Sequence, residues 1–264
     1  MRKNQPVSSL PSPLNRVLLS LLVPLAAATF LYNFAAGGNL NSRPALALFL
    51  GVLGAASWIL GLRWYGLPGL GLRGGRPLFA SIGFAVLAWL VVFLARLYFV
   101  DSRGLGSTGA AAEFFHLLVF EAFCTQLYAF GPFFRSVADW RGPLTASIAS
   151  GVLFGFIGFT YFGESLLNQF QQLDVIFVTG PSLWQGILFF VIWGILYGVI
   201  RLRSGSILGS ILVQALQSFT TWFVLLPGGE WDPQWQNWMY LIVGLFFIII
   251  IWRLWPKTEE DYRV

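Results

Sequence analysis

Long apolar runs are the feature of this sequence that most restricts its fold. Eight segments of about 20 residues are dominated by aliphatic and aromatic side chains, and a helix of that length crosses the roughly 30 Å hydrocarbon core of a bilayer. The dyad alternation that a membrane β-barrel requires is missing. The expected spans are 17–36, 45–62, 78–100, 111–134, 145–163, 183–201, 207–227 and 237–255. The sequence therefore predicts an all-α polytopic membrane protein with about eight transmembrane helices.

These spans define the predicted domain organisation. Residues 17–255 form a single transmembrane helical domain, with a cytoplasmic N-terminal segment at 1–16 and a charged cytoplasmic tail at 256–264. Only 10% of the residues are charged and 57% are hydrophobic, whereas about a quarter of a typical soluble domain is charged. Membrane lipids are therefore the expected surroundings of most of the chain.

The distribution of basic residues predicts the orientation. With the N-terminus in the cytoplasm, 13 of the 16 Lys and Arg residues fall on that side, which leaves Arg43, Arg96 and Arg103 for the other. Cytoplasmic loops of membrane proteins carry such an excess. We expect a multi-pass protein of the plasma (inner) membrane with both termini cytoplasmic. The net charge of +5 reflects this topology, so nucleic acid is not an expected partner.

Two spans carry small residues at helical spacing. In the span 145–163, Ser147, Gly151 and Gly155 lie four residues apart, and Gly158 extends the same side. Small residues at this spacing allow a neighbouring helix backbone to approach closely. The span is therefore expected to lie centrally in the bundle. The span 183–201 repeats the pattern more weakly, through Gly194 and Gly198.

The span 207–227 has a polar face. Its polar side chains fall at i, i+4, i+7, i+8 and i+11, which is one side of a helix. A glutamine amide exposed to lipid would lack hydrogen-bond partners, so this face must meet another helix or a hydrated cavity. The residues of this face are Ser210, Gln214, Gln217, Ser218 and Thr221.

The span 111–134 contains an acid near its middle, Glu121. An ionisable residue within a membrane helix is costly and is by default a candidate for function. Glu113 and His116 form a secondary polar cluster near the end of the same span. At 100° per residue, His116 lies 60° to one side of Glu113 and Glu121 lies 80° to the other, so all three can face the bundle. A metal shared by His116 and Glu121 is not expected, and no metal site is predicted.

Together, the spans 111–134, 145–163 and 207–227 resemble the CPBP family of intramembrane proteases, which includes type II CAAX prenyl endopeptidases and bacteriocin-processing proteins. The family pattern is EExxxR on one helix, FxxxH on the next, and HxxxN or a close variant on a later one. Here these places read "EAFCTQ" from Glu121, "FGFIG" from Phe154 and "QALQS" from Gln214. The resemblance covers roughly residues 45–225, where "SGVLFGF" and "RSGSILGSILVQAL" also resemble the family, and it implies a CPBP-like helical bundle.

In such proteases the first glutamate is thought to activate water, while the histidines and asparagine position that water or a metal and stabilise the oxyanion. Carried over by position, only Glu121 keeps the family identity. Ala122 stands in place of the second glutamate and Gln126 in place of the arginine. Gly158 and Gln214 stand in place of the two histidines, and Ser218 in place of the asparagine. Glycine offers no ligand and glutamine is a far weaker base than imidazole. No catalytic set is intact, which predicts a pseudoenzyme.

The predicted pocket between these helices is lined by Glu121, Gln126, Gly158, Gln214, Gln217 and Ser218. The leading interpretation is a non-catalytic CPBP-like protein that acts as a scaffold, chaperone or accessory subunit, with other membrane protein subunits as partners. One alternative is an active CAAX-type endopeptidase with a rearranged site using Glu121, His116 and Glu113. Others are a transporter and a subunit that binds an apolar cofactor or pigment. No cofactor is predicted, and a metal or an apolar cofactor stays open.

Overall fold

The computed structural model describes residues 10–36, 43–99, 110–170, 181–220 and 233–263. Over these residues the chain is helical and contains no strand. Seven of its helices are α1 (Pro13–Ala36), α2 (Arg43–Gly69), α3 (Arg76–Phe99), α7 (Pro143–Phe170), α8 (Pro181–Ser204), α9 (Leu208–Phe219) and α10 (Pro233–Leu254). The predicted all-α polytopic fold is confirmed.

Between α3 and α7 the chain forms one further helical rod, Ala110–Arg141, which we call the fourth rod. It consists of α4 (Ala110–His116), the π-helical segment η1 (Leu117–Cys124), α5 (Thr125–Tyr128), a second π-helical segment η2 (Ala129–Phe133) and α6 (Phe134–Arg141). Among the described residues, this rod and the helices at Pro13–Ala35, Pro44–Gly69 and Arg76–Ala95 are long and apolar enough to cross a membrane. Shorter apolar helices occupy Pro143–Gly158, Leu208–Phe219 and Leu241–Leu254.

Two helices extend beyond their predicted spans. In each of them the chain kinks near the expected end and then continues as a helix. The span predicted at 45–62 continues to Gly69 through a kink at Gly66, where φ is +64°, and a proline follows at 68. The span predicted at 111–134 continues to Arg141 through a bend at Gly131, which precedes Pro132. Glycine and proline are the usual causes of such kinks. The end of the span predicted at 207–227 lies outside the described residues.

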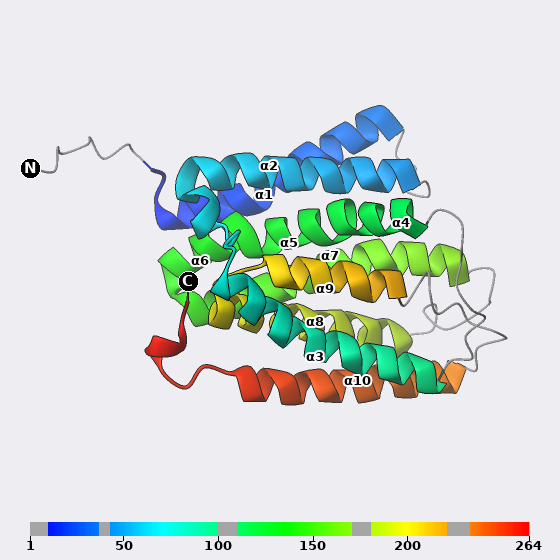
Figure 1. Ribbon diagram of the computed structural model, residues 1–264. Helices are drawn as coiled ribbons and strands as arrows, with labels where there is room; N and C mark the ends of the chain where they lie inside the picture. Colours follow the sequence, from blue (N-terminus) through cyan, green and yellow to red (C-terminus); the bar gives the residue numbers. More distant parts are fainter. Residues whose placement is uncertain (1–9, 37–42, 100–109, 171–180, 221–232, 264) are drawn as a thin grey trace, which may run out of the picture.

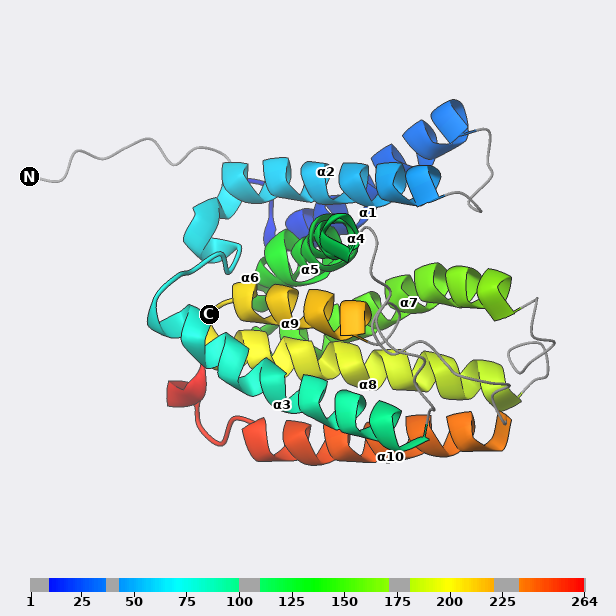
Figure 2. The ribbon, with the colours of Figure 1, turned by 45° about the vertical axis from the view of Figure 1, so that its right-hand side comes forward.

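The helices lie side by side in a bundle with the fourth rod in its interior. In Figure 1, α1 and α2 form one side of the bundle, while α3 and α10 form the opposite side. Figure 2 shows α4 nearly end on, between α2 and α9. Both of these helices pack against η1. The position of Glu121 within η1 therefore places it between two neighbouring helices.

The closest helix pair is α7 and α8. A Cβ on Gly151 would lie 2.5 Å from the backbone nitrogen of Ile195, and one on Gly155 would lie 2.7 Å from Cα of Val191. In the opposite direction, a Cβ on Gly198 would lie 2.8 Å from Oγ of Ser147. Only helices without side chains at these points can approach so closely. The predicted close approach is confirmed, and α8 is the partner of α7.

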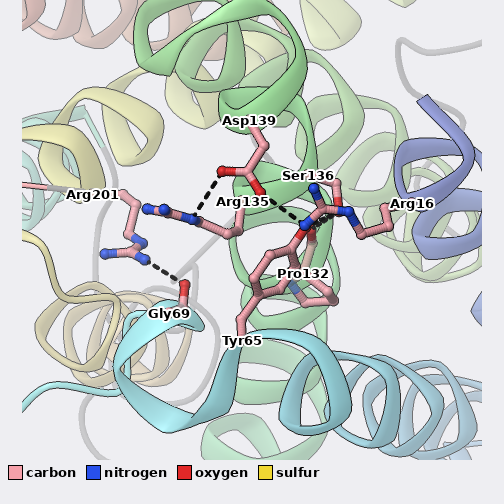
Figure 3. A network of polar contacts seen from close by, with 8 residues as sticks. All are labelled: Arg16, Tyr65, Gly69, Pro132, Arg135, Ser136, Asp139 and Arg201. Carbon is pink, nitrogen blue, oxygen red and sulfur yellow. Dashed lines mark hydrogen bonds and ion pairs between the residues drawn. The ribbon is translucent and has the colours of Figure 1, made fainter. Parts of the chain in front are cut away.

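A polar network joins α1, α2 and α6 near one end of the bundle (Figure 3). Nη1 of Arg16 donates to the hydroxyl of Tyr65 at 2.6 Å and to Asp139 at 2.8 Å. The Tyr65 hydroxyl also lies 3.0 Å from that of Ser136, and Arg135 pairs with Asp139 at 3.3 Å. One aspartate thus binds two arginines from different helices.

The C-terminal segment folds back onto the same end of the bundle. The backbone N–H of Arg263 donates to the Leu202 carbonyl of α8 at 2.9 Å, and Arg73 donates to the Arg263 carbonyl at 3.1 Å. An ion pair between Arg203 and Asp261 adds a side-chain contact. The predicted tail is therefore docked on the turn between α8 and α9 over its described residues.

Candidate functional site

Glu121 lies in a widened turn of the fourth rod. Residues Leu117–Cys124 form a π-helix, in which each N–H bonds to the carbonyl five residues earlier, so successive side chains are rotated by less than 100°. The angle expected between Glu113 and Glu121 on a regular α-helix is therefore wrong across this segment, whereas Glu113 and His116 both lie in the regular helix α4. Single π-helical turns occur frequently at functional sites. The sequence contains no periodicity that would have revealed this one.

The side chain of Glu121 is bound by α9. The hydroxyl of Ser218 donates a hydrogen bond to Oε1 of Glu121, and Nε2 of Gln214 donates to the Glu121 backbone carbonyl at 3.5 Å. Both donors come from the polar face predicted for this helix. The carboxylate of Glu121 therefore faces protein rather than lipid.

A second contact between the fourth rod and α9 lies one turn further along. Nε2 of Gln126 donates to Oε1 of Gln214 at 2.8 Å, and both side chains are fully buried. Oε1 of Gln126 has no hydrogen-bond partner among the described residues. The two amides thus form a chain from Gln126 through Gln214 to Glu121. We call Glu121, Gln126, Gln214 and Ser218, together with Thr125, the polar cluster.

Thr125 belongs to this cluster although the sequence did not identify it as a site residue. Its hydroxyl donates to the Glu121 carbonyl and lies 3.3 Å from that of Ala122. A threonine four residues after a carbonyl on a helix commonly bonds back to it, so the spacing was the available signal. Because Gln214 also donates to the Glu121 carbonyl, this one backbone oxygen accepts hydrogen bonds from two helices.

The other residues of the predicted pocket are buried without a described contact to this cluster. Gln217 is 4% exposed, and its Oε1 has no hydrogen-bond partner among the described residues. Gly158 is buried in α7. The rest of the predicted polar face also turns inward, since Ser210 lies 3.4 Å from Ser81 of α3. Thr221 lies outside the described residues.

The secondary cluster lies in α4. Glu113 and His116 are both half-buried. The His116 imidazole packs on the Phe120 ring with the two ring centres 5.3 Å apart. Cys124, the single cysteine, is a buried free thiol.

The chemistry open to the polar cluster is limited by its donor set. Glu121 is its one ionisable member, and the amides and hydroxyls around it are weak bases. Transition metals favour imidazole and thiolate ligands, and the described residues contain no group of three or more His, Cys, Asp or Glu side chains arranged for a metal. The cluster does not fit a zinc-type centre. Its side chains suit hydrogen bonding between helices or to a bound polar group.

The fold and the cluster define a polytopic membrane protein with a polar contact between its fourth rod and α9. Residues 107–220 match the family model described as type II CAAX prenyl endopeptidase Rce1-like. The resemblance to the CPBP family is confirmed. This range includes the stretches "SGVLFGF" and "RSGSILGSILVQAL", and also Glu121, Gly158, Gln214 and Ser218, which stand at the motif positions of the family. No curated protein sequence matches the chain.

Proposed function

We propose that this protein is a non-catalytic relative of the CAAX endopeptidases that acts as a scaffold or accessory subunit of a membrane complex. The observation that carries the proposal is the bonding of Glu121. Its carboxylate accepts from Ser218 and its backbone from Gln214, where the family resemblance would place an asparagine and a histidine. The acid is therefore used as a hydrogen-bond acceptor that fastens α9 to the fourth rod.

General base catalysis requires partners that this cluster lacks. A water attacking an amide needs a base to take its proton and groups that stabilise the oxyanion. Loss of one member of a cooperating catalytic set can remove most of the rate. With Gly158 and Gln214 in place of the two histidines, Glu121 is the one residue of the family's catalytic set that remains. Without catalysis, the helical bundle and the polar contact between α9 and the fourth rod serve in the assembly of a membrane complex.

The outer surface of the described helices can contact either a partner subunit or lipid. Large apolar side chains are exposed there, among them Phe34 at 82% and Trp252 at 72%. Aromatic side chains bury much area and pack well against neighbouring helices. A partner subunit that covers part of this surface would replace lipid contacts by helix contacts.

Purification from the native membrane in mild detergent tests the proposal. Wild-type protein is expected to retain a partner in fixed stoichiometry, and Glu121→Ala is expected to lose it because α9 is no longer fastened to the fourth rod. Glu259→Ala, in the exposed tail, is the matched control and should retain the partner. A wild-type protein that purifies alone, or a Glu121→Ala variant that keeps its partner, would count against an assembly role for this cluster.

The second candidate function is an endopeptidase with a rearranged site, which the family match favours. In this case Glu121 would have to break its hydrogen bond with the Ser218 hydroxyl before it could activate a water molecule. The candidate predicts cleavage of a membrane-anchored or prenylated peptide that Glu121→Ala abolishes. A cleaved peptide is therefore expected from the second candidate function and not from the first.

A further inference from the structure

The largest fully buried side chain of the described residues is an arginine. Arg201, in the last turn of α8, is 1% exposed. Its Nη2 donates to the Gly69 carbonyl of α2 at 3.1 Å, while Nε and Nη1 have no hydrogen-bond partner among the described residues. A guanidinium carries five N–H donors. Most of the donors of this buried cation are therefore unused.

The charge of Arg201 is also unpaired. A buried arginine is almost always paired with an acid, because an unpaired charge away from water is costly. The ion pairs among the described residues join Arg16 and Arg135 to Asp139 and Arg203 to Asp261, and none includes Arg201. The charges that act on Arg201 are those of Arg73 and Arg135, which are also positive. Among the described residues, the site therefore has an excess of positive charge and no acidic partner for Arg201.

The surroundings fix the guanidinium in place. Gly71 has φ of +81°, and a Cβ there would lie 2.5 Å from both Cζ and Nε of Arg201. On another side, the guanidinium lies 5.3 Å from the centre of the Phe134 ring of α6. Figure 3 shows Arg201 pointing at Gly69, with Arg135 nearby. Residues of α2, α6 and α8 thus build this site, and only glycine at position 71 leaves room for it.

We propose that Arg201 is the centre of an anion-binding site that takes a phosphate group. A phosphate oxygen accepts strong, charge-assisted hydrogen bonds from the N–H fork of an arginine. Arg73 and Arg135 are half-buried, so they extend the positive charge from Arg201 toward the surface. The phosphate could come from a lipid headgroup or from a soluble phosphate. The chemistry of recognition is the same for both sources.

A purely structural role for Arg201 leaves this excess charge unexplained. The Gly69 carbonyl lies at the end of α2, where a cation interacts favourably with the helix dipole. That single neutral acceptor satisfies one donor and brings no negative charge. A capping role predicts that removing Arg201 destabilises the protein without any anion. An anion site predicts that removing Arg201 without anion present is neutral or stabilising, because burying an unpaired charge is costly.

Thermal unfolding of the full chain tests the proposal in two arms. In one arm inorganic phosphate is added to protein in a neutral detergent that contains no phosphate, and in the other phosphatidylglycerol is added to the same detergent-solubilised protein. The wild type is expected to gain thermal stability in at least one arm, and the responding arm identifies the source. Arg201→Met should bind the anion roughly tenfold more weakly or not at all, which is the loss expected for charged hydrogen bonds. Arg253→Met, which removes a cation from the end of α10, is the control and should respond like the wild type.

A wild type that responds in neither arm, or an Arg201→Met variant that responds equally, would overturn the proposal. Without anion, Arg201→Met should be at least as stable as the wild type, and a marked loss of stability would indicate a capping role instead. If Arg201→Met does not fold, the double variant Arg73→Gln/Arg135→Gln tests the anion site instead. Its response should be severalfold weaker than that of the wild type, and an unchanged response would refute the site.

Discussion

Gln126 and Gln214 share a buried hydrogen bond of 2.8 Å although 88 residues separate them in the chain. The bond connects the fourth rod to α9, and it lies beside the Ser218–Glu121 bond that connects the same two elements. Both amides are fully buried in the protein, away from bulk water. The two bonds therefore fix how these helices are aligned.

Replacing the two glutamines tests this alignment. Gln126→Leu and Gln214→Leu are each expected to lower the free energy of unfolding. Either substitution leaves the remaining buried glutamine amide without its hydrogen-bond partner. The double variant should lose less than the sum of the singles. The coupling energy of such a bond between membrane helices is about 0.6 kcal/mol and reaches about 1.7 kcal/mol. A double-mutant cycle measured by unfolding in detergent gives this value, and strict additivity would argue against the bond.

The close approach of α7 and α8 predicts a sharp difference between glycines. Gly151→Ala places a methyl group against the α8 backbone, so we expect a loss of about 1–3 kcal/mol in the free energy of unfolding, as for other overpacked positions. Gly83→Ala in α3 meets nothing within 4 Å and should be neutral or stabilising by up to about 1 kcal/mol. Equal effects of the two substitutions would contradict the described packing.

Arg16 is expected to stabilise the bundle through the fourth rod. Its side chain is 11% exposed and binds both Tyr65 and Asp139, and hydrogen bonds to charged groups contribute about 1.5–3 kcal/mol. Arg16→Met should lower the free energy of unfolding by an amount in this range. Asn15→Ala, at an exposed neighbouring position, is the control. The idea fails if the two variants unfold alike.

The docking of the C-terminal segment should depend on pH. The backbone N–H of Lys257, followed by that of Thr258 and the ion pair with Arg203, hold the pKa of Asp261 below its ordinary value. Lys257 and Thr258 belong to the same segment as Asp261, so the part of this lowering that depends on docking is the part from Arg203, and it favours docking above the ordinary pKa of about 3.9. This contribution disappears as the pH falls through the lowered value.

A spin label at position 260, in a Cys124→Ser background, reports this docking. The label should be immobile at neutral pH and mobile in acid, and Asp261→Asn should make it more mobile at neutral pH. High salt should weaken the partly exposed Arg203–Asp261 ion pair and so also make the label more mobile. A label that is equally mobile at all pH values would show that Asp261 does not hold the segment.

The sequence predicted the parts of this structure that depend on helical period. The small residues of 145–163 and the polar residues of 207–227 fall on single faces, and the structure places both faces against other helices. The inward position of Glu121 followed from the cost of a charge in lipid. These predictions needed only the period of 3.6 residues and the chemistry of the bilayer.

The rest depends on contacts between distant residues, which no local pattern reveals. The π-helical turn around Glu121 changes the period itself, so an α-helical wheel misplaces the residues on either side of it. Arg201 was counted with the basic residues expected at the membrane surface, because arginines at the end of an apolar span usually reach water. Its burial depends on Gly71 and Phe134, which are far from it in sequence.

The proposed function rests on the protein having no proteolytic activity. The direct measurement is mass spectrometry of a prenylated CAAX peptide incubated with the reconstituted wild type and with Glu121→Ala, with and without added zinc. We predict no cleavage product above the protein-free control in any of these reactions. A product formed by the wild type and lost in Glu121→Ala would contradict the claim and establish an active endopeptidase.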